Sequence, residues 1–93
     1  MLTAIVLVHT AADRIPEVAQ SIADLHGVAE VYSCAGDVDL IALLRVRDHE
    51  QIADIVTKHI SKVDGVRRTA THIAFRSYSS LDTDSGFEVG QGD

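Results

Sequence analysis

The chain repeats one local pattern: a stretch with helical periodicity ends in Gly-Val, and a run of strand-forming residues starts there. The pattern occurs as LHGV at 25–28 and as VDGV at 63–66. Glycine is a common helix stop, because it tolerates left-handed backbone angles. Each stop is preceded by apolar residues spaced three or four apart, which is typical of an amphipathic helix. The repeat therefore divides the chain into two strand–helix–strand halves.

The segments of these halves follow in a recognisable order. Strands are expected at 2–10, 28–36, 40–46 and 66–78, and helices at 13–27 and 48–65. A β-α-β-β-α-β order predicts a ferredoxin-like α+β fold, in which a four-stranded antiparallel sheet carries both helices on one face. This is also the architecture of the dimeric α+β barrels.

Two of the expected strands are apolar on both faces. Residues 2–10 read LTAIVLVHT and residues 40–46 read LIALLRV, whereas a strand with one solvated face should alternate with polar residues. We therefore expect the helix-free face to pack on the same face of a second copy, giving a homodimer at least, with a ring of dimers as a larger form. The alternative is that the alanines make these strands less apolar than the pattern suggests, so that the helix-free face stays solvated.

The net charge of −6 is unevenly distributed. Residues 79–93 hold four acidic and no basic side chains, so we expect an acidic tail without regular structure after a folded domain at 1–78. The remainder is nearly balanced in charge, and the whole chain has only two Phe and two Tyr, so it lacks the surface of a nucleic-acid-binding protein. A single cysteine, no signal sequence and no long apolar run favour a cytoplasmic location without membrane contact.

With these segments in place, the chain resembles a known family. GVAEVYSCAGDVDLIALLRVRD followed by DGVRRTATHIAF is similar to the RAM (regulation of amino acid metabolism) domain of the leucine-responsive/AsnC-type (Lrp/AsnC) transcriptional regulators, over residues 1 to about 78. The resemblance implies an amino acid effector bound where dimers meet. Full-length members carry an N-terminal helix-turn-helix, which is not seen here. The chain is thus expected to be a stand-alone RAM domain without direct DNA binding, or alternatively a cloned fragment.

The turn between the two central segments, Gly36-Asp37-Val38-Asp39, has two interpretations. Glycine and aspartate are ordinary turn residues, because one adopts positive φ and the other caps nearby N–H groups. A free amino acid, however, also needs acceptors for its ammonium group. The resemblance implies that this hairpin borders the effector pocket. We assign Asp39 mainly to the turn, and Asp37 or exposed backbone groups to the ligand.

Thr69 and Thr71 are two residues apart, so both hydroxyls lie on one face of the last expected strand. Threonine is favoured in strands in any case. The resemblance implies that this Thr-x-Thr also contributes to the pocket, and groups from a neighbouring subunit would complete it.

Two other functions remain open beside this sensing role. A small α+β barrel enzyme of the monooxygenase or isomerase type would need a base or haem ligand, for which His9 or His72 are the candidates. A ligand-free adaptor would co-assemble with a full-length regulator. No carboxylate–histidine pairing or metal-binding spacing is evident among the five histidines, so we expect no catalytic residues, metal or cofactor.

Overall fold

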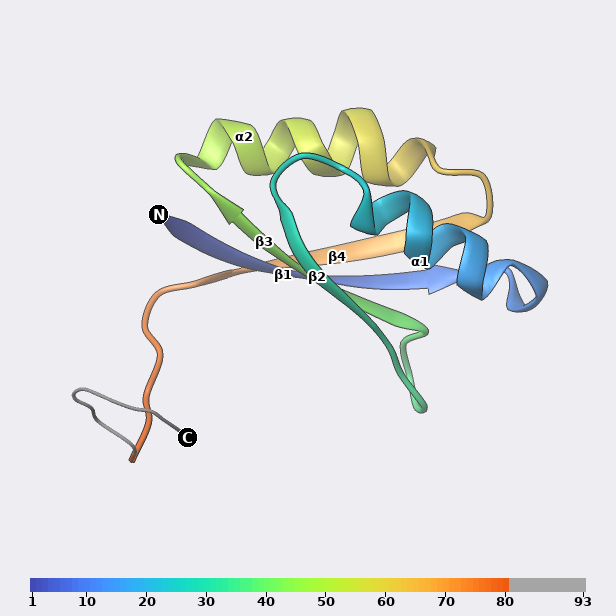
Figure 1. Cartoon of the computed structure of the whole chain (residues 1–93), viewed down its shortest axis with the longest axis horizontal. Helices are drawn as coiled ribbons and strands as arrows, with labels where there is room; N and C mark the ends of the chain where they lie inside the picture. Colours follow the sequence, from blue (N-terminus) through green and yellow to red (C-terminus); the bar gives the residue numbers. More distant parts are fainter. Residues whose placement is uncertain (81–93) are drawn as a thin grey trace.

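The structure is a computed structural model that describes residues 1–80, and it has the expected order of elements. Two helical segments lie on one side of a four-stranded sheet, and within residues 1–80 the other side carries no helix (Figure 1). The strands are β1 (Leu2–Thr10), β2 (Val28–Ser33), β3 (Leu40–Val46) and β4 (Val66–Ala74), and the main helices are α1 (Ile15–Ala23) and α2 (His49–Asp54).

The sheet order is β2-β3-β1-β4, and every neighbouring pair is antiparallel. The two strands that are apolar on both faces, β1 and β3, therefore occupy the centre of the sheet. The predicted ferredoxin-like α+β fold is confirmed. Its central pair has Val8 opposite Leu40 and Leu2 opposite Val46.

The core lies between the sheet and the helices. On β1 and β3, alternate residues are buried, and they pack against buried residues of the helical segments. The intervening residues of the two strands, from Thr3 to His9 and from Ile41 to Arg45, face the helix-free side. The core consists of Ala4, Val6, Val8, Val18, Ile22, Leu40, Ala42, Leu44, Val46, Ile52, Ile55 and Ile60.

The α-helix of the first helical segment is shorter than the predicted 13–27, since α1 runs from Ile15 to Ala23. A short 3-10 turn at Ala12–Arg14 precedes α1, in which Pro16 occupies the first turn. Proline suits that position because its missing N–H has no partner there in any helix. Val18 and Ile22, one turn apart, are the buried residues of α1.

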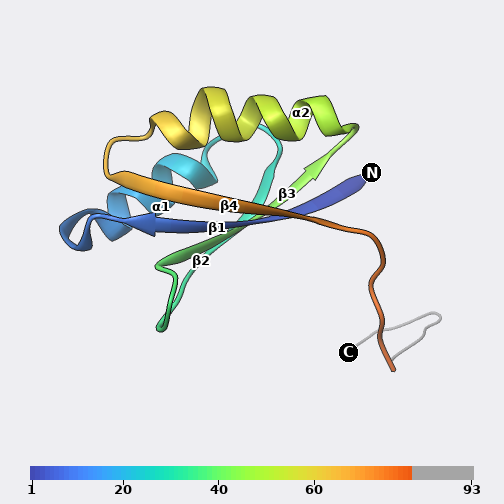
Figure 2. The same ribbon diagram turned by 180° about the vertical axis from the view of Figure 1, so that it is seen from behind.

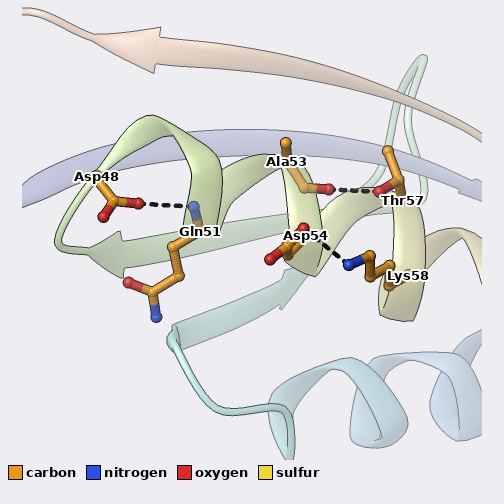
Figure 3. Close-up of polar contacts among 6 residues, drawn as sticks. All are labelled: Asp48, Gln51, Ala53, Asp54, Thr57 and Lys58. Carbon is orange, nitrogen blue, oxygen red and sulfur yellow. Dashed lines mark hydrogen bonds and ion pairs between the residues drawn. The ribbon is translucent and has the colours of Figure 1, made fainter.

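The second helical segment is irregular. Asp48 caps it by accepting a hydrogen bond from the Gln51 backbone N–H at 2.8 Å (Figure 3), which is a common role of aspartate at the start of a helix. After α2 the chain forms a π turn at Ile55–His59 and a 3-10 turn at Ile60–Lys62. The wider π turn, closed by the N–H of Ile60 on the carbonyl of Ile55, brings two residues that are five apart back onto the buried face.

The β2–β3 hairpin and the segment after β4 both extend away from the helices (Figures 1 and 2). The strands that lead into them are shorter than predicted, since β2 ends at Ser33 rather than at residue 36 and β4 at Ala74 rather than at residue 78. Most of the expected acidic tail falls in residues 81–93 and lies outside the described residues. No helix within residues 1–80 is both long and apolar enough to cross a membrane.

Candidate functional site

Asp39 fixes the hairpin to the end of β1. Its backbone N–H donates to the carbonyl of Val8 at 3.1 Å, and its carboxylate accepts the backbone N–H of Thr10 at 2.9 Å. The turn is closed by the N–H of Cys34 on the carbonyl of Asp39 at 2.9 Å, and Gly36 has a φ of 128°. Asp39 and Gly36 thus have the structural tasks that turn chemistry predicts for them.

Asp37 is held through its backbone, and its carboxylate has no partner within residues 1–80. The backbone carbonyl of Asp37 lies 2.8 Å from Nε2 of His9. Because a carbonyl only accepts, Nε2 must carry the hydrogen and donate it. The Asp37 side chain is therefore an exposed acid at the tip of a hairpin that is itself well anchored.

His9 also reaches the other neighbour of β1. Its second ring nitrogen, Nδ1, accepts a long hydrogen bond of 3.4 Å from Nε of Arg68 on β4. One imidazole thus links the hairpin to β4 across the end of β1. Sequence reasoning missed this link. The signal for it was topological, since the end of β1 must lie beside the start of β3.

A bulge lies at the two consecutive arginines of β4. Arg68 lies opposite His9, but Thr10 pairs with Val66 and leaves Arg67 without a partner on β1. Strict alternation does not apply at a bulge, so the order of residues along β4 does not by itself place Arg67 and Arg68 on opposite faces of the sheet.

Thr69 and Thr71 share one face of β4, as predicted. They lie opposite Val8 and Val6, whose buried side chains face the helices. Thr69 is half-buried and Thr71 is exposed, because the helices leave the outer edge of β4 open. Within one chain, β1 separates both threonines from the hairpin, and no hydrogen bond among the described residues connects them to it.

Three cavities of the single chain lie away from these residues. Two of them, of about 300 and 360 Å³, adjoin Met1 and Arg45, where β1 begins and β3 ends. A third, of about 250 Å³, lies between Leu25 and His59. None of the three is lined by the hairpin, Thr69 or Thr71. Among the predicted site residues, Gly36, Asp37 and Thr71 are exposed in one chain, and Val38, Asp39 and Thr69 are half-buried.

The helix-free face combines an apolar centre with a polar rim. Ile5, Leu7, Ile41 and Leu43 stay half-buried there, and Tyr32 of β2 pairs with Ile41 and is 48% exposed. Arg45, Glu30, Arg68 and His72 occupy the same face by register, toward its margins. An apolar patch with a polar rim is typical of a protein interface.

His9 and His72 do not face each other. His9 lies opposite Arg68, and His72 lies opposite Ile5, four residues further along β4. In the part of the chain that the structure describes, no three metal-ligating side chains cluster.

A family model described as the Lrp/AsnC ligand binding domain matches residues 3–83. The chain belongs to this family. The curated transcriptional regulator LrpA of Pyrococcus horikoshii, described as HTH-type, is 35% identical over 72 residues, which are 77% of this chain and 51% of that protein. The Lrp/AsnC domain described here thus spans about half the length of the curated relatives it matches.

Solved structures show the same fold. TTHA0845 from Thermus thermophilus is 46% identical, with a TM-score of 0.80 over 85% of this chain and 99% of that one. The Neisseria meningitidis transcriptional regulator NMB0573, solved as a complex with L-Met, is 18% identical, with a TM-score of 0.75 over 84% of this chain and 52% of that one. Both likenesses support the fold, and the family rests on the family model and on the likeness to LrpA.

Proposed function

We propose that this Lrp/AsnC domain senses a small amino acid at a site between chains and is not an enzyme. The observation that carries the proposal is that the two aspartates of the hairpin have different roles. Asp39 anchors the turn to Thr10, whereas the Asp37 carboxylate remains exposed and without a partner in residues 1–80. A free carboxylate on a rigid support suits the ammonium group of an amino acid.

The family relationship supports an amino acid as the ligand. NMB0573, which shares the fold, was solved with L-Met bound, and the curated relative LrpA is named as a transcriptional regulator. A zwitterion needs acceptors for its ammonium group and donors for its carboxylate. Exposed acids and hydroxyls, as in Asp37 and Thr71, supply both kinds of group.

The site requires more than one chain. Thr69 and Thr71 lie on the helix-facing side and outer edge of β4, while the hairpin lies beyond β1. A ligand that contacts both must take the hairpin from one chain and the threonines from another. Gly36, Val38 and Asp39 would form the backbone wall around Asp37, and the neighbouring chain would supply the hydroxyls.

Assembly through the helix-free face would provide the basic unit. Its half-buried centre (Ile5, Leu7, Ile41 and Leu43) is better covered by a second copy than by water. Contacts between such dimers would then create the effector site and couple ligand binding to assembly. A full-length regulator of the family, carrying its own DNA-binding domain, is the downstream partner that LrpA suggests.

A thermal-shift panel of the common L-amino acids on wild type and Asp37→Ala, followed by calorimetry, tests the proposal. At about 100 times its dissociation constant, a ligand should add roughly 2.7 kcal/mol to the free energy of unfolding. Wild type should respond to at least one amino acid, and Asp37→Ala should not. If no amino acid shifts wild type, the sensing role fails and the ligand-free adaptor takes its place.

A further inference from the structure

We propose that Arg68 binds the carboxylate of the amino acid effector, and that His9 positions it. This inference rests on the proposed function and adds to it the cationic group for the ligand. The hairpin supplies acidic side chains and carbonyls, which suit an ammonium group but repel a carboxylate. A site for a zwitterion needs a positive partner nearby, and Arg68 is tied to the hairpin through His9.

The hydrogen bonds of His9 determine which donors of Arg68 stay available. Nε2 of His9 donates to the carbonyl of Asp37, so Nδ1 is the acceptor, and it receives Nε–H of Arg68. A guanidinium has five N–H donors. With Nε–H engaged, the four hydrogens on the two terminal nitrogens remain, and their geometry matches the two oxygens of a carboxylate.

Within one chain, the positive charge of Arg68 has no ion-pair partner among residues 1–80. The side chain is exposed, and neither of the ion pairs among residues 1–80, Arg14–Asp64 and Asp54–Lys58, involves it. The nearest acid along this network is Asp37, with one imidazole ring between its backbone and Arg68. An amino acid laid along this line would have its ammonium group at Asp37 and its carboxylate at Arg68.

Calorimetry with each common L-amino acid and its carboxamide distinguishes recognition of the ligand's carboxylate from recognition of its ammonium group. The pair L-methionine and L-methioninamide is one example. The amide keeps the ammonium group and loses the carboxylate charge. Wild type should bind its preferred acid about ten- to a hundred-fold more tightly than the amide, as expected for a charge-assisted pair. Arg68→Gln should lose most of that preference, because it should weaken binding of the acid and leave binding of the amide unchanged.

Matched variants make the result specific. Arg76→Gln removes the same charge beyond the far end of β4 and should keep the wild-type preference. Arg68→Lys should retain part of it, since lysine keeps the charge without the paired donors. His9→Phe should weaken acid binding in wild type but have no further effect on the acid-to-amide preference in the Arg68→Gln background.

The outcomes distinguish this inference from the proposal beneath it. If wild type binds no amino acid, the proposed function fails and the role of Arg68 falls with it. If wild type binds an amino acid but Arg68→Gln keeps the full preference for acid over amide, only the role of Arg68 is wrong. An equal loss of acid and amide binding in Arg68→Gln would likewise overturn it, because it would indicate a general disturbance of the hairpin.

Discussion

Asp39 and Thr10 continue the β1–β3 ladder beyond its last backbone pair, with a carboxylate taking the place of a carbonyl. The Asp39 carboxylate accepts the Thr10 backbone N–H at 2.9 Å, and the Asp39 N–H donates to Val8 at 3.1 Å. The hairpin is thus fixed by a side chain as well as by its backbone. This leaves its second acid, Asp37, available for another role.

Asp39→Ala should destabilise the fold by about 1–3 kcal/mol, because it leaves the N–H of the buried residue Thr10 without a partner. Asp39→Asn keeps an acceptor oxygen and should cost less. Asp37→Ala, at an exposed side chain, should change the free energy of unfolding by no more than about 0.5 kcal/mol. Urea denaturation of the three variants measures this. Equal losses in the free energy of unfolding for Asp37→Ala and Asp39→Ala would contradict the different roles assigned to the two aspartates.

Gly65→Ala should be more destabilising than Gly36→Ala. Both glycines have positive φ, so both substitutions bring backbone strain of about 1–3 kcal/mol. An added Cβ at Gly65 would lie 2.9 Å from Cγ2 of the buried Val18, whereas nothing lies within 4 Å of one at Gly36. Only Gly65→Ala therefore also disturbs packing. The midpoints of urea denaturation, compared between variants with equal m-values, test which substitution is more destabilising. A larger loss of stability for Gly36→Ala would refute the predicted order.

Wild type should be a dimer or larger in light scattering coupled to size exclusion, and Leu43→Glu should shift it toward the 10.0 kDa monomer. Leu43 lies in the apolar centre of the helix-free face, where a charge cannot be desolvated cheaply. The control is Ile73→Glu, on the open edge of β4 and 41% exposed, which should leave this dimer intact. If wild type is monomeric at micromolar concentration, the apolar helix-free face of the sheet does not cause assembly.

Tyr32 should ionise at higher pH than an ordinary tyrosine. A side-chain hydrogen bond with Glu30, and the negative charge of that carboxylate, raise the pKa of Tyr32. Because the folded-state pKa is raised, the stabilising contribution is present at lower pH and is lost as pH rises through the tyrosine range. In a Tyr78→Phe background, ultraviolet titration should show the pKa of Tyr32 falling when Glu30→Gln is added. No change would exclude Glu30 as the cause.

Local periodicity was sufficient to predict the order of the elements, because each helix shows its buried stripe and each Gly-Val marks a real boundary. The Asp48 cap was predictable for the same reason, since Gln51 stands three residues away. The π turn at Ile55–His59 was not. It depends on how the helical segment lies on the sheet, and the spacing between Ile55 and Ile60 shows this only once the core is known.

The candidate site was only partly predictable. Turn chemistry identified Gly36 and Asp39, both of which act within the hairpin. The link from Asp37 through His9 to Arg68 joins residues 28 and 59 positions apart in sequence, so local patterns carry no signal for it. The placement of Thr69 and Thr71 on the far side of β1 likewise follows from strand order, which local patterns do not show.

The most direct test of the central claim, an amino acid site shared between chains, is calorimetry on mixed oligomers. Asp37→Ala and the double variant Thr69→Val/Thr71→Val should each fail to bind the amino acid that wild type prefers. After subunit exchange between the two, some sites combine an intact hairpin with intact threonines, so binding should return at reduced stoichiometry. A mixture that still binds nothing, although mass spectrometry shows exchange, would contradict the shared site.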